Sequence, residues 1–140
     1  MGKTFTCEIQ VRWADFDRLG HVNNTKYFEY AQEARLLFYT ECMYASGGIR
    51  RAVAVLRKTD MEFLVPVTGE SGPLTIDVAV THIGTSSYSI RHIMRDVRGR
   101  TCAVANAVIV GFDLKEQVVR PLKDDERNLL SEYLVEASLS

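Results

Sequence analysis

The segment DFDRLGHVNN, residues 15–24, gathers the side chains of this 140-residue chain that could most readily do chemistry. It holds two carboxylates, one imidazole and two amides, with a glycine among them. A carboxylate or an imidazole can act as a nucleophile or a general base. The same residue types also build ordinary turns, because Asp and Asn side chains bond to nearby main-chain amides. The segment therefore predicts either a plain turn or an active site at the junction of two elements.

The elements on either side of this segment are predicted to be a strand and a long helix. Residues 4–13 alternate between apolar and polar side chains, which is typical of a half-buried strand. From Asn24 to about Met43 the chain has no Gly or Pro, and apolar side chains cover most of the helical circumference. Such a helix is buried on several sides. The sequence SGG at residues 46–48 is expected to end it.

The rest of the chain predicts four strands and a short helix. Strands are expected at residues 52–65, 74–82, 88–94 and 102–112, with a tight turn at residues 84–87. The sequence KDDE then opens a helix, with Asp124 as its N-cap. Short turns between successive strands favour an antiparallel sheet. The pattern thus predicts a single α+β domain over residues 1–140, with one helix packed on an antiparallel sheet.

The overall composition excludes several classes of protein. The chain is 46% hydrophobic and 25% charged, with a formal net charge of −1, so it lacks the basic balance of a nucleic-acid binder. No apolar run approaches a membrane span, and no apolar leader opens the chain. The three widely spaced cysteines fit neither a disulfide framework nor a zinc site. We therefore expect a cytoplasmic protein that binds no metal, nucleic acid or membrane.

The stretch VRWADFDRLGHVNNTKYFEYAQEAR, residues 11–35, resembles the hot-dog fold acyl-CoA thioesterases of the 4-hydroxybenzoyl-CoA thioesterase-like family. The resemblance lies in a strand, an acidic D-x-D segment, a glycine shortly after it, and Asn and Tyr at the helix start. It continues more weakly through DMEFLVPV, GTSSYSIRH and the strand around residues 104–110. It implies a hot-dog fold, in which a curved antiparallel sheet wraps around one long central helix. It also implies a homodimer or homotetramer that hydrolyses acyl-CoA without a metal or organic cofactor.

The same resemblance implies roles for the residues of the opening segment. Asp17, the second acidic residue of D-x-D, would be the catalytic nucleophile or a general base acting through water. Main-chain N–H groups near Asn23 and Asn24 would polarise the thioester carbonyl, because a helix N-terminus offers free amides and a positive dipole end. Gly20 would allow a tight turn. Asp15 is expected to be structural, and either Asn23 or Asn24 could be the helix N-cap.

Two further sets of residues are implied. The residues expected to support Asp17 or to line the acyl pocket are His21, Val22, Tyr27, Phe63 and Val65. The residues expected to bind CoA are Gly84, Thr85, Ser86, Ser87, Arg57 and Arg91. Simpler roles stay open for three of these groups: His21 as a surface turn residue, Tyr27 as a core residue and the arginines as a solvated face. His82 and His92 are expected in the core or at an interface.

Other functions remain open. A hot-dog hydratase or dehydratase would use an Asp–His pair, but its signature carries a proline that this segment lacks. An acyl-carrier-protein thioesterase would share the catalytic residues and differ only in its docking surface. A non-catalytic acyl-CoA sensor is disfavoured because 140 residues leave no room for a partner domain. The sequence RLGHVN, with no aromatic residue, points to a fatty or general acyl-CoA rather than an aryl-CoA.

Overall fold

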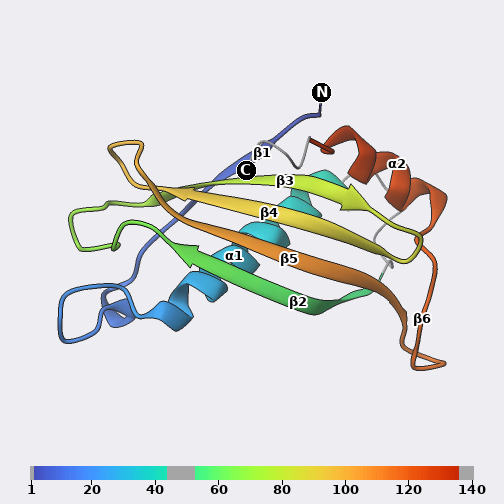
Figure 1. Ribbon diagram of the computed structural model, residues 1–140, viewed down its shortest axis with the longest axis horizontal. Coiled ribbons are helices and arrows are strands. Elements are labelled where there is room, and N and C mark those ends of the chain that lie inside the picture. The colour runs from blue at the N-terminus through green and yellow to red at the C-terminus, as the bar shows by residue number, and fades with distance from the viewer. Residues whose placement is uncertain (1, 44–52, 136–140) are drawn as a thin grey trace.

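The computed structural model describes residues 2–43 and 53–135 (Figure 1). The elements in chain order are β1 (Phe5–Ile9), a 3-10 turn (Trp13–Asp15), α1 (Asn24–Phe38), a π-helical turn (Tyr39–Met43), β2 (Ala54–Phe63), β3 (Leu74–Ile83), β4 (Ser87–Arg95), β5 (Thr101–Asp113), β6 (Val118–Val119) and α2 (Asp124–Glu132). The predicted α+β class and the predicted order of elements are confirmed. The predicted break at residues 46–48 lies outside the described residues.

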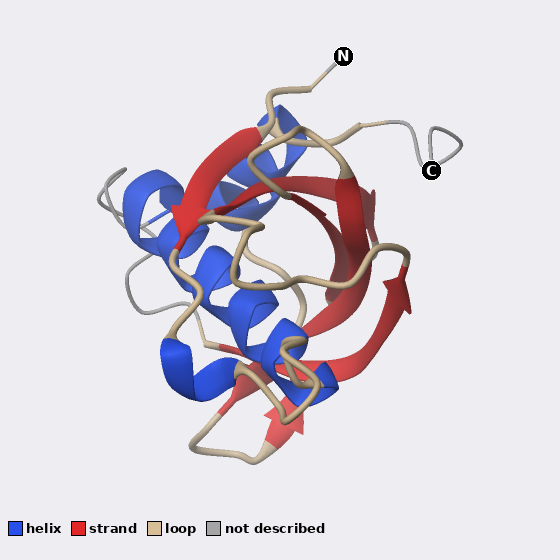
Figure 2. Cartoon of the chain, turned by 90° about the vertical axis from the view of Figure 1, so that its left-hand side faces the viewer, coloured by secondary structure: helices blue, strands red, loops and turns tan. Residues whose placement is uncertain are grey.

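One antiparallel sheet curls around α1 (Figure 2). Its strand order is β1-β3-β4-β5-β2, and β6 adds to β5. The strands from β3 to β5 follow one another as hairpins, so their short turns give the antiparallel pairing that the sequence predicted. The long central helix within a curved sheet is therefore confirmed.

The core lies between α1 and the concave face of the sheet. Tyr30, Ala34 and Phe38 on α1 are fully buried, as are Ile76 on β3 and Ile90 on β4. Burying a large apolar side chain contributes about 1.5–3 kcal/mol. This contact fixes the rotation of α1, and with it the direction in which the first turn of the helix points.

The N-terminal strand is shorter than predicted. It ends at Ile9, and Trp13 begins a 3-10 turn with 90% of its surface exposed. The chain turns here because the Asp15 carboxylate is drawn into the protein interior by the main-chain N–H of Arg12 and the hydroxyl of Tyr30. The predicted cap of α2 is one residue late, since Lys123 is the N-cap and Asp124 is the first helical residue.

The β2 strand forms a ten-residue edge of the sheet. The alternation of its side chains changes before residue 58, because a bulge at Arg57 shifts the pairing with β5. As a result Leu56, rather than Val55, lies opposite Ile109 on the face that points toward α1. Leu56 and Phe63 stay 48% and 46% exposed. No helix among the described residues is long and apolar enough to cross a membrane.

Candidate functional site

The first turn of α1 is held by the residues directly before it. Asn23 is the N-cap, and its Oδ1 accepts hydrogen bonds from the main-chain N–H and the hydroxyl of Thr25, at 3.0 and 2.9 Å. The Asn23 N–H donates to the carbonyl of Asp15 at 2.9 Å. These bonds explain why the helix begins at Asn24, and they fix its orientation relative to the preceding loop.

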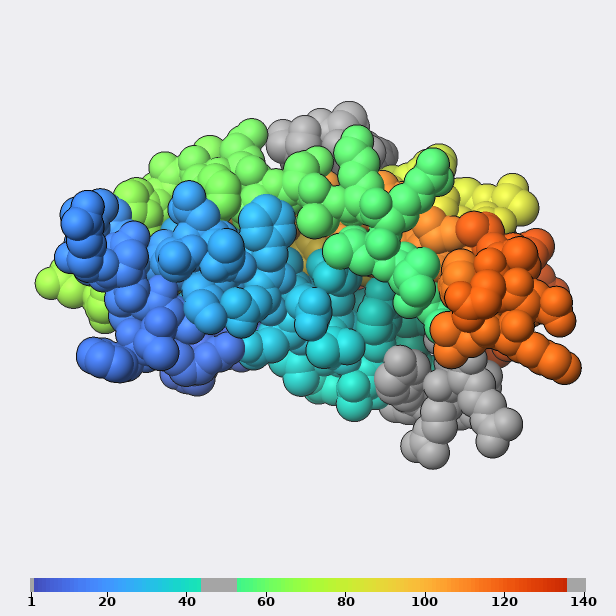
Figure 3. Space-filling model, turned by 90° about the horizontal axis from the view of Figure 1, so that it is seen from below, coloured from blue at the N-terminus to red at the C-terminus, as the bar shows by residue number. Residues whose placement is uncertain are grey.

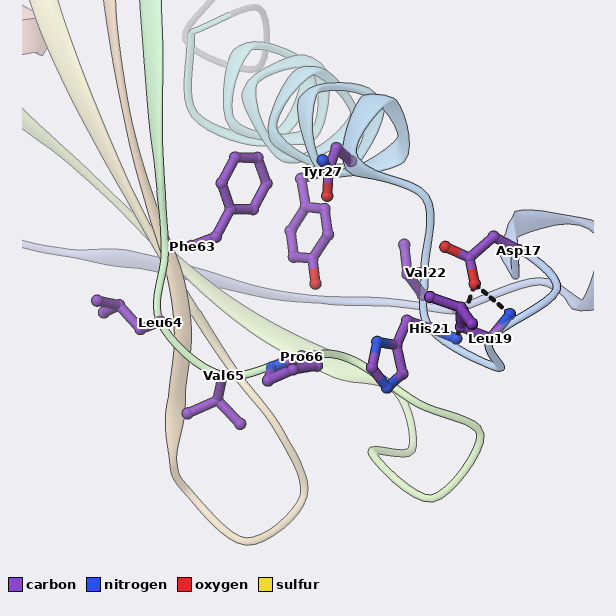
Figure 4. Close-up of a pocket in the computed structure, with 10 residues that line it drawn as sticks. Asp17, Leu19, His21, Val22, Tyr27, Phe63, Leu64, Val65 and Pro66 are labelled. Atoms are coloured by element: carbon purple, nitrogen blue, oxygen red, sulfur yellow. Dashed lines mark hydrogen bonds between the residues drawn. The ribbon is translucent and has the colours of Figure 1, made fainter.

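Asp17 anchors a tight loop through its own carboxylate (Figure 4). Its Oδ1 accepts from the main-chain N–H of Leu19 at 2.8 Å and of His21 at 3.2 Å. Gly20, with φ of 76°, makes the turn that the sequence predicted. The plain-turn alternative is therefore present, but it engages only one oxygen. Asp17 is exposed, and its Oδ2 accepts no hydrogen bond from any residue that the structure describes.

A pocket of about 460 Å³ opens beside this carboxylate, between the loop, the first turn of α1 and the end of β2. Its lining includes Asp17, Leu19, His21, Val22, Asn24, Tyr27, Phe63, Leu64, Val65 and Pro66. The structure thus brings together Asp17, Asn24 and all five residues predicted to support Asp17 or to line the acyl pocket. Asn23 and Gly20 position these residues from outside the lining.

The apolar wall of the pocket is packed from two sides. The Tyr27 and Phe63 rings meet edge to face, with centroids 4.9 Å apart (Figure 4). The Tyr27 hydroxyl accepts from the Val67 N–H at 3.2 Å, and the Val22 N–H donates to the Val67 carbonyl at 2.8 Å. Val22 and Tyr27 are therefore buried, so Tyr27 serves the core as well as the pocket. Burial raises the pKa of Tyr27 despite its bond from Val67, so the hydroxyl stays neutral.

The predicted carbonyl donors need one correction. The Asn23 N–H is already bonded to Asp15, so it is not available to a ligand. The Asn24 N–H is the first amide of α1 and has no acceptor within residues 2–43 and 53–135. Asn24 lines the pocket, whereas Asn23 does not. The free donor at the helix start is therefore the amide of Asn24.

Asp15 and Asp17 lie in opposite environments although one residue separates them. Asp15 is 4% exposed, and its Oδ2 accepts from the Tyr30 hydroxyl at 2.5 Å and from the Arg12 N–H at 3.0 Å. Burial raises the pKa of Asp15, but these two bonds and the Arg12 charge outweigh it, so the pKa is lowered overall. Asp15 is a buried anion that fixes the chain before the pocket.

The predicted CoA-binding residues do not join the pocket within one chain. The turn at residues 84–87 lies at the opposite end of the sheet from the Asp17 loop (Figure 1). Its main-chain atoms hold neighbouring segments: the carbonyls of Thr85 and Ser86 accept from Leu122 and Gly111 at 2.9 and 2.8 Å.

The two predicted arginines also lie apart from each other. Arg57 is exposed at the β2 bulge. Arg91 is 9% exposed, on the sheet face away from α1, and its Nε and Nη1 have no partner in the described part of the chain. Arg91 lines a separate pocket with Asp60 and Asn106, so it does not join the Asp17 pocket within one chain, and its role in binding CoA stays a prediction.

The sequence analysis missed a buried polar cluster near the C-terminal half of α1. Arg35 is 7% exposed and its Nη1 donates to Nε2 of His92 at 3.3 Å. The hydroxyls of Tyr39 and Tyr88 are 2.8 Å apart beside them. Burial, and then the Arg35 charge, lower the pKa of His92 to about 3, so this histidine is neutral. Burial also lowers the pKa of Arg35.

A sequence signal for this cluster existed. Arg35 follows Tyr27 and Ala31 at intervals of four, so a cation falls on the buried stripe of the helix. The core role predicted for His92 is confirmed, whereas His82 is exposed at the end of β3. Among the described residues, no group of three or more His, Cys, Asp or Glu side chains is placed to hold a metal ion.

Comparison with known proteins identifies a matching family and several solved structures with a similar fold. Residues 11–131 match the family model of the thioesterase-like superfamily. A predicted thioesterase from Bacillus stearothermophilus superposes with a TM-score of 0.83 at 23% identity, covering 96% of this chain and 98% of that one. A 1,4-dihydroxy-2-naphthoyl-CoA thioesterase from Synechocystis gives 0.78 at 19% identity, covering 93% and 97%. A thioesterase from Thermus thermophilus, complexed with coenzyme A and Zn, gives 0.74 at 24% identity, covering 89% and 90%.

The structural likeness establishes the hot-dog fold, and the family model spans most of the chain. This protein therefore belongs to the thioesterase-like superfamily.

Proposed function

We propose that this protein hydrolyses the thioester of acyl-CoA to the free acid and CoA, with Asp17 as nucleophile or general base. One observation carries the proposal. A carboxylate is held through a single oxygen beside a pocket with an apolar wall, and Asn24, whose main-chain N–H is the free first amide of a long helix, lines the same pocket. A thioester needs this pair, a base or nucleophile for its carbon and a donor for its oxygen.

The chemistry follows from this pairing. The carbonyl oxygen would accept from the Asn24 N–H, where the helix dipole favours the negative charge that develops. As a general base, Asp17 would take a proton from water as the water adds to the carbonyl carbon, and the C–S bond would then break to release CoA. As a nucleophile, Oδ2 would add to the carbonyl carbon, and the C–S bond would break to release the CoA thiolate and leave an anhydride with Asp17. Water would then hydrolyse this anhydride to the free acid and the Asp17 carboxylate. Both routes use the oxygen that no described residue engages.

The rival hydratase chemistry lacks its pair of side chains. Asp17 contacts His21 through the main-chain N–H, and the imidazole itself is not bonded to the carboxylate. His21 is exposed and lies on the rim of the pocket, beside Pro66 (Figure 4). The aromatic and aliphatic wall, with Val22, Tyr27 and Phe63, would hold the acyl chain next to Asp17.

A homodimer, or a homotetramer built from it, forms part of the proposal. The β2 edge exposes unpaired main-chain groups over ten residues, and long exposed edges tend to pair. If two copies of β2 pair antiparallel about their middle, the start of each strand meets the end of the other. That pairing would place the partner's Arg57 opposite Asp60, three residues before Phe63, and would turn the partner's 84–87 end toward the Asp17 side. This geometry supports a CoA site shared between subunits.

The cysteines agree with the expected cytoplasmic location. Cys7, Cys42 and Cys102 are free thiols in the structure. Free thiols persist in a reducing compartment.

The test is release of free thiol from short, medium, long-chain and aromatic acyl-CoAs, comparing wild type with Asp17→Asn. The Asn side chain keeps the Oδ1 acceptor and removes the charge. Asp113→Asn is a matched control, because Oδ1 of Asp113 also accepts two main-chain amides in a turn, from Lys115 and Glu116 at 2.9 and 3.0 Å. We expect turnover to fall by about a hundredfold or more in Asp17→Asn alone.

Other outcomes would redirect the proposal. Equal turnover in Asp17→Asn and wild type would remove Asp17 as the catalyst. Thiol release from acyl carrier protein, but from no CoA ester, would identify the carrier-protein thioesterase instead. Failure of wild type on both substrate classes would overturn the hydrolase.

A further inference from the structure

The face of α1 that lines the Asp17 pocket continues along the helix to a second hollow. Asn24 and Tyr27 line the first pocket, and Gln32, Arg35, Leu36 and Tyr39 line a smaller one of about 140 Å³. Residues spaced by three or four share one helical face, so a single stripe of α1 serves both. Figure 3 shows this side of the molecule, where α1 and β2 run beside each other with the sheet visible between them.

The β2 strand supplies the opposite wall in the same way. Phe63 lines the Asp17 pocket, while Leu56 and Ala54 line the smaller hollow. The bulge at Arg57 is what turns Leu56 to the face that Met61 and Phe63 share. Phe28, Leu36 and Leu56 are 38%, 52% and 48% exposed along these two walls. The two hollows lie along the same two walls, and we call the surface between α1 and β2 that holds both of them the α1–β2 groove.

The far end of the α1–β2 groove holds an unneutralised cation. Arg35 is only 7% exposed, and its one hydrogen bond given by the structure goes to the neutral His92. Within residues 2–43 and 53–135 no carboxylate lies within ion-pair distance of its guanidinium. A buried charge without a counterion lowers the stability of the folded protein. We therefore expect an anionic group of a ligand to bind beside this guanidinium.

We propose that the α1–β2 groove selects acyl chains that end in a second carboxylate, with Arg35 binding that carboxylate. The inference rests on the proposed thioester hydrolysis, because the same chain must place its thioester at Asp17. The planar guanidinium can accept a carboxylate side by side through two N–H donors. The substrate class is then the CoA monothioester of a dicarboxylic acid.

The separation of the two ends sets the length of the chain. Asn24 and Arg35 are eleven positions apart, so about 16 Å of helix axis lies between the free amide and the buried cation at 1.5 Å per residue. A medium-length chain spans this distance and a short one does not. A chain ending in a methyl group would cover the Arg35 end without neutralising it, and would leave the guanidinium desolvated.

The experiment compares kcat/KM for dodecanedioyl-CoA and dodecanoyl-CoA, which differ only in the terminal group. We expect the kcat/KM of wild type to be at least roughly tenfold higher for dodecanedioyl-CoA, because a buried pair of opposite charges forms only with that substrate. Arg35→Met should bring the ratio of the two values to about one, and Arg35→Lys should keep part of it. Arg98→Met, which removes a cation from an exposed turn, should leave the ratio unchanged.

A binding measurement separates this inference from the proposed chemistry. Calorimetric titration of wild type with the monoamide of dodecanedioic acid and with dodecanamide needs no turnover, because each amide stands in for the thioester and only the first ligand carries a terminal carboxylate. Tighter binding of the monoamide of the diacid by wild type supports the Arg35 site even if Arg35→Met fails to fold. Equal binding and equal kcat/KM for the two chains would overturn it. So would loss of subunit association in Arg35→Met with the preference intact, since the cation would then pair with a second copy. Absence of thiol release from every CoA ester would instead remove the proposed function.

Discussion

The two ends of α1 hold their chemical groups by opposite means. At the N-terminal end, Asp17 is exposed and its carboxylate is held only by main-chain amides two and four residues away. At the other end, Arg35 is buried and held by His92, which lies 57 residues further along the chain. The first end is a product of local turn geometry. The second exists only because the curved sheet closes over the helix.

This difference predicts how the position of each group responds to changes elsewhere in the protein. A group held by adjacent amides keeps its place when distant packing changes, and its exposed oxygen remains open to water and ligand. A group held by side chains of the sheet depends on the register between β4 and α1, but it is shielded from water, where electrostatic interactions are stronger. The following changes test this contrast.

The largest effect is expected at the exposed end. Asp17→Asn should reduce kcat by about a hundredfold or more, while the free energy of unfolding changes by less than about 1 kcal/mol, because only exposed hydrogen bonds are altered. Thiol-release kinetics and urea unfolding of the same preparation measure both quantities. A large loss of stability in Asp17→Asn would contradict the view that the loop holds itself locally.

Removal of the Asp15 carboxylate should lower the stability of the protein much more than removal of the Asp17 charge does. Asp15→Ala leaves the Tyr30 hydroxyl and the Arg12 N–H without their acceptor, so we expect a loss of about 2–3 kcal/mol in the free energy of unfolding. Urea unfolding measures this loss. Tyr30→Phe as a single variant, and in combination with Asp15→Ala, completes a double-mutant cycle. Additive losses would show that the bond between the two side chains contributes nothing.

The buried end should make stability depend on pH. The pKa of His92 is lowered to about 3 in the folded protein, whereas its ordinary value is 6.5. Below pH 6.5 the imidazole is therefore protonated in the unfolded chain and stays neutral in the folded one. Stability from this group is complete above pH 6.5 and falls as the pH falls toward 3. Between pH 7 and pH 5 the loss should be about 2 kcal/mol.

The control for this pH dependence is His92→Gln, whose side chain does not titrate. Urea unfolding of both proteins at about pH 7, 6 and 5 gives the difference in slope. Parallel slopes for the two proteins would show that His92 does not carry the pH dependence.

The smallest effect should come from the turn itself. Gly20 has φ of 76°, and an added Cβ would meet no atom within 4 Å, so Gly20→Ala acts through backbone conformation alone. We expect a loss of about 1 kcal/mol in stability together with a few-fold lower kcat, because the strain falls on the loop that presents Asp17. Gly99→Ala is a matched control, with φ of 81° and open space. It should lose similar stability and no kcat.

Much of this molecule could be predicted from the sequence. The helix from Asn24, a cap at one of the two asparagines, the turn at Gly20 and the positions of the main strands all follow from short-range patterns. The Asp17 pocket also contains every residue that was expected to line it. Strand ends were less accurate, because the burial of Asp15 ended β1 early and the bulge at Arg57 reversed the alternation of β2.

The sequence by itself determined the elements and the Asp17 loop, because those structures depend on interactions between residues a few positions apart. Only the tertiary structure decided that Asn24, and not Asn23, offers a free amide, since Asp15 had to be placed first. Only the tertiary structure set the 84–87 turn at the far end of the sheet and buried Arg35 against His92. Such contacts join distant residues, and they depend on strand register and on the curvature of the sheet around α1.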